Sequence, residues 1–262
     1  MRIGFYQFAP KFGEVGTNLK HIAAALGNVE ADVIVLPELA TSGYLFLNQE
    51  EVQALAEPVP GPTTEFLRQL ARKRGCHFVM GVAERAGDDI YNSAVLVGPD
   101  GVVGTYSKAH LFYEEKYFFR AGNLGFPLFE IAGVKVGLLV CFDHAYPEAA
   151  RTLALGGAQI ICHPSNLVLP GIAQLTTRVR SLENRVFWVL GNRCGTEERG
   201  GKTLSFTGRS QIVAPNGTLL VEAPAEGESL SIVEIDPSEA SDKHITPLND
   251  LFADRRPEVY QL

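Results

Sequence analysis

Short apolar runs recur along the whole chain of 262 residues. Each run is four to seven residues long, is rich in valine and isoleucine, and is bounded by turn-forming residues, a pattern typical of buried β-strands. The predicted strands cover residues 3–8, 33–36, 77–83, 93–97, 102–106, 128–131, 134–140, 159–163, 187–192, 210–213, 219–222 and 229–235. These strands are too numerous for one small open sheet, so the sequence predicts two sheets packed face to face.

Helical periodicity is confined to fewer segments. Apolar residues recur at helical spacing in residues 17–29, 63–74, 147–155 and 172–185. Pro147 and Glu148 suit the first turn of the third segment, because proline is tolerated there and a carboxylate faces the positive end of the helix dipole. We expect an α/β fold with helices on the outer faces of the sheets, formed by a single domain over residues 1–262.

Composition and charge exclude several classes of partner. Hydrophobic residues make up 46% of the chain and charged residues 20%, which is typical of a folded globular protein. The net charge of -7, with no lysine or arginine run, argues against nucleic acid and anionic membrane as ligands. The sequence shows neither a signal peptide nor an apolar segment long enough for a membrane span. We expect a cytoplasmic protein with reduced thiols at Cys76, Cys141, Cys162 and Cys194.

Cys141 directly follows the apolar run at residues 136–140. Ligands of open α/β sheets bind beyond the carboxyl ends of strands, so a thiol at this position suits a nucleophile. A buried structural cysteine is the alternative. His144 lies close in sequence, but the histidine of a cysteine protease comes from a distant position, and we interpret His144 as a residue of the pocket wall or surface.

Two other predicted strands end in charged residues. Glu38 follows the run at residues 33–36, and Lys108 follows the run at residues 102–106 and precedes an aromatic stretch. Taken singly, Glu38 could be a helix cap or surface acid, and Lys108 an ordinary lysine at a strand end. If the three strands lie parallel in one sheet, however, Glu38, Lys108 and Cys141 meet in one cleft.

With these residues, the sequence resembles the nitrilase superfamily of carbon-nitrogen hydrolases over nearly its whole length. The matching motifs are Leu36-Pro37-Glu38 with Ser42-Gly43-Tyr44, Lys108-Ala109-His110-Leu111-Phe112, Cys141-Phe142-Asp143 with Pro147-Glu148, and the tail Asp254-Arg255-Arg256-Pro257-Glu258. The resemblance implies a four-layer αββα sandwich of two mixed sheets and a Glu-Lys-Cys triad. It also implies that Glu115 is a second, supporting glutamate.

The resemblance further implies a mechanism. Glu38 acts as general base toward Cys141, a thioester forms on the sulfur, and Lys108 with the backbone N–H of Phe142 stabilises the oxyanion. Glu115 orients Lys108 or the substrate. The sequence lacks the usual zinc-site spacings and glycine-rich phosphate loops, so we expect neither a metal nor a cofactor.

The substrate is less constrained. The chain is short for true nitrilases, so the resemblance favours the amidase-like branch. The candidate substrate-binding residues, each of which could instead serve packing or a loop, are Tyr44, Tyr113, Phe142, His144 and Asn166. Few of them are charged, which indicates a small neutral aliphatic amide. A nitrile, an N-carbamoyl compound or an ω-amide remains an alternative, as does a non-catalytic binding protein on the same fold. The resemblance also implies a homodimer or higher homo-oligomer.

Overall fold

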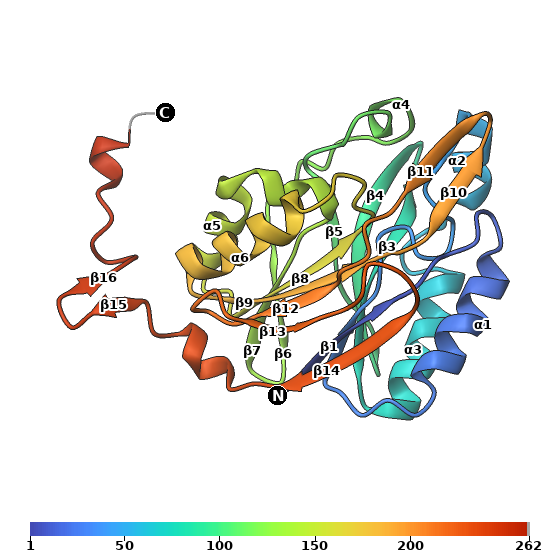
Figure 1. Cartoon of the computed structure of the whole chain (residues 1–262). Helices are drawn as coiled ribbons and strands as arrows, with labels where there is room; N and C mark the ends of the chain where they lie inside the picture. The colour runs from blue at the N-terminus through green and yellow to red at the C-terminus, as the bar shows by residue number, and fades with distance from the viewer. Residues whose placement is uncertain (261–262) are drawn as a thin grey trace.

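Two six-stranded mixed β-sheets, packed face to face, form the body of the protein (Figure 1). This is a computed structural model that describes residues 1–260. In order across the first sheet, the strands are β14 (Ser229–Glu234), β1 (Arg2–Gln7), β2 (Val33–Val35), β3 (His77–Ala86), β4 (Asp89–Gly98) and β5 (Gly101–Ser107). In order across the second, they are β13 (Leu219–Glu222), β12 (Gln211–Val213), β9 (Phe187–Asn192), β8 (Ile160–Ser165), β7 (Val134–Leu138) and β6 (Leu128–Ile131). The predicted pair of mixed sheets is confirmed.

The two sheets share one pattern of strand directions. In the first sheet β1, β2 and β3 are parallel, and in the second sheet β7, β8 and β9 are parallel. The remaining strands of both sheets pair antiparallel with their neighbours. Parallel strands buried on both faces are near-continuous apolar runs, which explains why the central strands were recognisable in the sequence.

Helices cover the outer face of each sheet, which makes four layers (Figure 1). The first sheet is covered by α1 (Val15–Leu26) and α3 (Pro62–Arg74), and the second by α5 (Pro147–Leu155) and α6 (Ile172–Asn184). These four correspond to the predicted helical segments. Short helices that the sequence did not predict are α2 (Gln49–Leu55), α4 (Glu115–Phe118) and the 3₁₀ helices η1 (Cys141–Ala145), η2 (Pro237–Ala240) and η3 (Pro257–Val259).

The main core lies between the sheets. Ile3 and Val35 of the first sheet belong to the same buried cluster as Ile160 and Val189 of the second, and all four are fully buried. Burying each such side chain is worth about 1.5–3 kcal/mol. The sheets approach closely at Gly191, where a Cβ atom would lie 2.8 Å from the backbone oxygen of Val35.

Two hairpins lie outside the sandwich. The hairpin of β10 (Thr196–Arg199) and β11 (Lys202–Ser205) turns at Gly200 and Gly201, which both have positive φ angles, as the tightest hairpin turns require. The hairpin of β15 (His244–Thr246) and β16 (Asn249–Asp250) belongs to a tail that extends away from the body (Figure 1). Within residues 1–260, no helix combines the length and apolar character that crossing a membrane requires.

Candidate active site

The predicted catalytic residues meet, but they come from both sheets. Glu38 follows β2 and Lys108 follows β5 in the first sheet, whereas Cys141 follows β7 in the second. The expectation that one sheet delivers all three residues is therefore wrong. The physical reason is that the sheets are stacked, so strand ends from opposite layers face each other across the sandwich.

The Glu38 carboxylate is held by one of its oxygens. Its Oε1 accepts hydrogen bonds from Asn92 Nδ2 at 2.6 Å and from Lys108 Nζ at 2.8 Å. Its Oε2 is buried and has no hydrogen-bond partner among residues 1–260. Gly81 permits the close crossing of β3 beneath this residue, because a Cβ atom there would lie 2.3 Å from the Cα of Glu38. The arrangement leaves one fixed oxygen and one oxygen available for chemistry.

Lys108 joins the two glutamates. Its Nζ lies 2.7 Å from Glu115 Oε1, and the side chain is fully buried. Burial opposes the ammonium form, but the charges of Glu115 and Glu38 together raise the pKa of Lys108. Lys108 thus remains a buried cation, and its removal would leave two buried carboxylates without a counter-charge.

Glu115 is held by donors on both oxygens. Tyr44 donates its hydroxyl to Oε1 at 2.7 Å, and the backbone N–H of Phe112 donates to Oε2 at 3.1 Å. Burial raises the pKa of Glu115 against the opposing effect of Lys108. Burial, followed by the Glu115 charge, also raises the pKa of Tyr44, so the phenol stays a donor. Tyr44 is therefore part of the charged cluster, as a hydrogen-bond donor to Glu115.

Cys141 begins η1 with a φ angle of 43°, a left-handed conformation that is strained for a residue other than glycine. Its side chain is buried, and burial followed by the Glu38 charge raises the pKa of the thiol, while Lys108 lowers it. The resting thiol is thus protonated and needs a base to react. Glu38 supplies a carboxylate close enough to influence it electrostatically.

Asp143 connects the nucleophile turn to the lysine loop. Its Oδ2 accepts the Val140 backbone N–H and the Tyr106 hydroxyl, both at 2.9 Å, and its Oδ1 lies 2.8 Å from His110 Nδ1. The sequence-based prediction did not include Asp143 among the site residues. A carboxylate two positions after the candidate nucleophile, beside an apolar run, was the signal that could have identified it.

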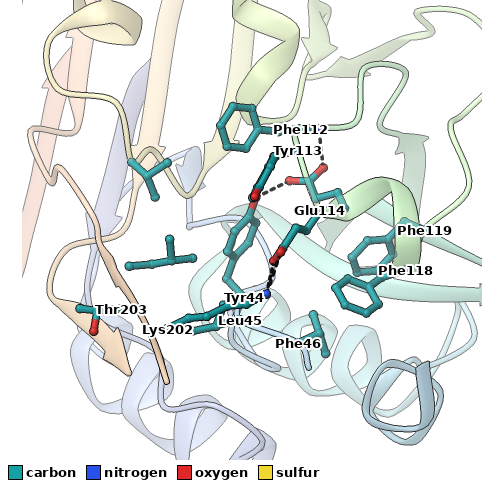
Figure 2. A pocket seen from close by; sticks show the side chains of 13 residues that line it. Tyr44, Leu45, Phe46, Phe112, Tyr113, Glu114, Phe118, Phe119, Lys202 and Thr203 are labelled. Carbon is teal, nitrogen blue, oxygen red and sulfur yellow. Dashed lines mark hydrogen bonds and ion pairs between the residues drawn. The ribbon is translucent and has the colours of Figure 1, made fainter. Parts of the chain in front are cut away.

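Two cavities adjoin the charged cluster. A cavity of about 190 Å³ is lined by Cys141, Phe142, His144 and Asn166 together with apolar residues of the loop after β8. A second cavity of about 370 Å³ has Glu115 in its wall, together with Tyr44 and Tyr113, which Figure 2 labels. The lining residues that the two cavities share are Phe112 and Val168. All five candidate substrate-binding residues thus line one cavity or the other.

The carbon-nitrogen hydrolase family profile matches residues 3–244. The chain belongs to this family. It is 44% identical over 264 residues to a protein named nitrilase from Pyrococcus abyssi, covering 99% of both chains. It is 29% identical over 279 residues to the N-carbamoylputrescine amidase of Solanum lycopersicum, covering 95% of this chain and 90% of that one.

Solved structures agree with the fold of this carbon-nitrogen hydrolase. A carbon-nitrogen hydrolase from Helicobacter pylori superposes with a TM-score of 0.90 at 28% identity, covering 99% of this chain and 96% of that one. A glutamate-to-glutamine mutant of the Nesterenkonia sp. AN1 amidase superposes with a TM-score of 0.81 at 28% identity, covering 98% and 94%. That structure shows covalent addition of the acetamide moiety of fluoroacetamide at its active-site cysteine.

His144 lies in the pocket wall of the hydrolase. Its Nδ1 is 2.7 Å from Thr176 Oγ1, and burial followed by the Arg180 charge lowers the pKa of His144 to about 4. The imidazole is therefore neutral near neutral pH. The hydrolase has no group of three or more His, Cys, Asp or Glu side chains within residues 1–260 that could hold a metal ion. Its four cysteines are free and buried.

Proposed function

We propose that this carbon-nitrogen hydrolase converts small neutral aliphatic amides into carboxylic acids and ammonia. The observation that supports this most directly is the Glu38 carboxylate, whose Oε1 is fixed by two contacts, whose Oε2 has no hydrogen-bond partner within residues 1–260, and whose charge acts on the protonated Cys141 thiol. A carboxylate in this setting can take up the thiol proton and return it to the leaving nitrogen.

The proposed reaction has two stages. Glu38 takes the proton of Cys141 as the sulfur attacks the amide carbon, and Lys108 with the Phe142 N–H stabilises the resulting oxyanion. Glu38 then gives this proton to the amide nitrogen, the C–N bond breaks, and ammonia leaves. In the second stage Glu38 takes a proton from water, the hydroxide attacks the thioester, and the Cys141 sulfur leaves with that proton. The acid is released and the enzyme is regenerated.

The cavity beside Cys141 supports a small acyl group. Its volume of about 190 Å³ is below the range of about 300–1,000 Å³ that is usual for ligand pockets. Its wall includes Leu167, Ile172 and Ala173, and it contains no arginine, lysine, aspartate or glutamate. A short uncharged chain fits this lining, because a charged chain would lose its hydration without gaining a partner.

Asn166 favours an amide over a nitrile. The side chain lines the same cavity, donates through Nδ2 to the Glu38 backbone oxygen at 2.9 Å, and has an Oδ1 that is buried without a partner within residues 1–260. A buried acceptor of this kind is costly unless the ligand supplies an N–H donor. Primary amides carry such donors, whereas nitriles carry none.

The test is ammonia release from amides and nitriles of two to six carbons, with Cys141→Ala as the control. We expect turnover of primary amides above that of the matched nitriles and of the N,N-dimethyl amides. Intact mass after mixing with substrate should show a thioester on the wild-type chain alone. Activity that survives in Cys141→Ala would contradict the mechanism, and faster nitrile turnover would contradict the substrate assignment.

A carbamoyl amine is the second candidate substrate. The larger cavity carries the ion pair of Lys202 Nζ with Glu114 Oε1 at 2.7 Å, and its wall is rich in aromatic side chains (Figure 2). Either Lys202 or Glu114 could contact a charged end of the substrate. The relative from Solanum lycopersicum is named for a carbamoyl amine. For that substrate class, Glu114→Gln should raise KM for N-carbamoylputrescine and leave KM for butyramide unchanged. If Glu114→Gln changed KM equally for N-carbamoylputrescine and for butyramide, the result would favour the neutral amide as the substrate.

A further inference from the structure

His163 contacts the backbone of the nucleophile. It lies on β8, is fully buried, and its Nε2 is 2.8 Å from the carbonyl oxygen of Cys141. Ser165 Oγ lies 3.2 Å from the same Nε2. The proposed reaction gives His163 no task, because its contact with Cys141 is to the backbone carbonyl and His163 does not line either cavity.

Trp188 determines which nitrogen of His163 carries the proton. Its indole Nε1 lies 3.3 Å from His163 Nδ1, and the two rings meet edge to face with centroids 5.4 Å apart. An indole N–H can only donate, so Nδ1 must accept and Nε2 must carry the hydrogen. Burial lowers the pKa of His163 to about 3, so the ring keeps this neutral tautomer across the physiological range. The hydrogen bond therefore runs from His163 to Cys141.

This hydrogen bond controls a peptide plane. The Cys141 carbonyl and the Phe142 N–H belong to one planar unit and point in opposite directions. Fixing the carbonyl oxygen on His163 thus fixes the direction of the Phe142 N–H. Without this hydrogen bond the plane could turn about the Cα–C bond of Cys141, a residue that already has the strained φ angle of 43°.

We propose that His163, oriented by Trp188, is a positioning residue that aims the Phe142 N–H at the oxyanion. The inference rests on the proposed role of Cys141 as nucleophile, and it assigns a task to two residues of the second sheet. Oxyanion donors act only when they point at the developing charge, so a rotated plane loses its stabilising effect.

The test compares two reactions of the same thiol. In both reactions Glu38 takes the thiol proton of Cys141. With p-nitrophenyl acetate, the Cys141 sulfur attacks the carbonyl carbon, an oxyanion forms, and p-nitrophenolate leaves as the thioester forms. With methyl methanethiosulfonate, the sulfur attacks sulfur, methanesulfinate leaves as a disulfide forms, and no oxyanion arises. Both rates are measured in the wild type and corrected with Cys141→Ala, and their ratio reports the oxyanion site alone.

Three substitutions and one control carry the comparison. His163→Leu removes the donor, His163→Gln retains an N–H donor, and Trp188→Phe removes only the group that sets the tautomer. His77→Leu is the matched control, since His77 also places a ring nitrogen near a backbone oxygen, that of Asp32 at 3.3 Å, but lies at the start of β3.

We expect His163→Leu to lower the ratio at least about tenfold, part of the 10²- to 10³-fold typical of a lost oxyanion donor. His163→Gln should recover part of the loss, Trp188→Phe should give a smaller loss, and His77→Leu should give none. An unchanged ratio would overturn the proposal, whether neither rate changes or both rates fall by the same factor. If His163→Leu does not fold, Trp188→Phe decides alone, because phenylalanine fills most of the same space.

The outcomes also separate this proposal from the proposed function. A wild type that reacts with p-nitrophenyl acetate but hydrolyses no amide would contradict the amidase assignment, while the ratio would still decide the role of His163. A wild type that reacts with neither reagent faster than Cys141→Ala would overturn both.

Discussion

Asn92 Nδ2 lies 2.6 Å from Glu38 Oε1, the same carboxylate oxygen that Lys108 contacts. The two donors occupy one oxygen and leave the other without a protein partner within the described part of the chain. Because the amide of Asn92 carries no charge, it fixes the carboxylate without supplying a second counter-charge. Glu38 is thus fixed in orientation through one oxygen, while the other oxygen is left available to accept a proton.

Glu38→Gln should abolish turnover while preserving the fold. Glutamine keeps the shape and can keep one hydrogen bond, but it cannot accept the thiol proton. Loss of a general base typically costs about 10²- to 10⁴-fold in rate. Ammonia release measures the loss, and circular dichroism checks the fold. Glu84→Gln, on β3 of the same sheet, is the control and should retain full activity.

The Cys141 thiol should stay protonated through neutral pH. Its pKa is raised above the ordinary value of 9.0 by burial and by the Glu38 charge, both of which disfavour the anion. Deprotonation therefore requires a higher pH than for an exposed cysteine. The difference in thiolate ultraviolet absorbance between wild type and Cys141→Ala should show no step below pH 9.0. A step near neutral pH would mean that Lys108 outweighs burial.

Tyr44→Phe should lower kcat by a few fold up to about tenfold, because one hydrogen bond is worth about 0.5–1.5 kcal/mol. The substitution removes the hydroxyl that donates to Glu115 at 2.7 Å and loosens the carboxylate that holds Lys108. Steady-state kinetics on the best amide checks this. Tyr117→Phe is the control, since Tyr117 is exposed. If Tyr44→Phe and Tyr117→Phe changed kcat equally, the Tyr44 hydroxyl would have no role in supporting the Glu115 carboxylate.

Asp143→Asn should reduce both stability and activity. The Asp143 Oδ2 accepts from Val140 and Tyr106 while its Oδ1 faces the backbone N–H and the Nδ1 of His110, and an amide cannot accept on both sides as the carboxylate does. An unsatisfied buried group costs about 1–3 kcal/mol, which should appear in urea unfolding. The exposed Asp88 provides the control substitution, Asp88→Asn, which should change neither property. Unchanged stability in Asp143→Asn would show that the network contributes little.

The outer face of α6 carries exposed apolar residues and is a candidate interface for the predicted homodimer. Exposed apolar side chains recur there at helical spacing, namely Ile172, Leu175, Val179 and Leu182. Such a stripe is costly in water, and a second copy of the chain would cover it. The double substitution Leu175→Glu and Val179→Glu should therefore shift the sedimentation coefficient to that of a monomer. A wild type that already sediments as a monomer would contradict the homodimer.

The sequence predicted the architecture well where the spacing of apolar residues and the residue types of a segment indicated the same kind of element. The strands at Leu128–Ile131, Phe187–Asn192 and Leu219–Glu222 and the helix at Pro147–Leu155 have the predicted limits. Hairpin β10–β11 was missed because its strands are mostly polar, and β11 lines a cavity instead of entering the core. Its glycine pair was the remaining signal of a turn.

The candidate site was predictable as a set of residues but not as a geometry. Glu38, Lys108 and Cys141 are recognisable because each follows an apolar run, yet nothing in their spacing assigns the runs to different sheets. Asp143 and His163 were not predicted as site residues because their contacts are with backbone atoms of the nucleophile turn. Contacts of that kind depend on which strands become neighbours.

Because the predicted triad is divided between two sheets, catalytic activity should report whether the two sheets are packed against each other. A loosened state that keeps both sheets and all helices, but lets the layers drift apart, retains each catalytic side chain on its own strand end and yet has no assembled catalyst. Activity should therefore disappear with core packing, ahead of the loss of secondary structure. In this molecule the hydrophobic interface between the sheets is what holds Glu38 and Lys108 in register with Cys141.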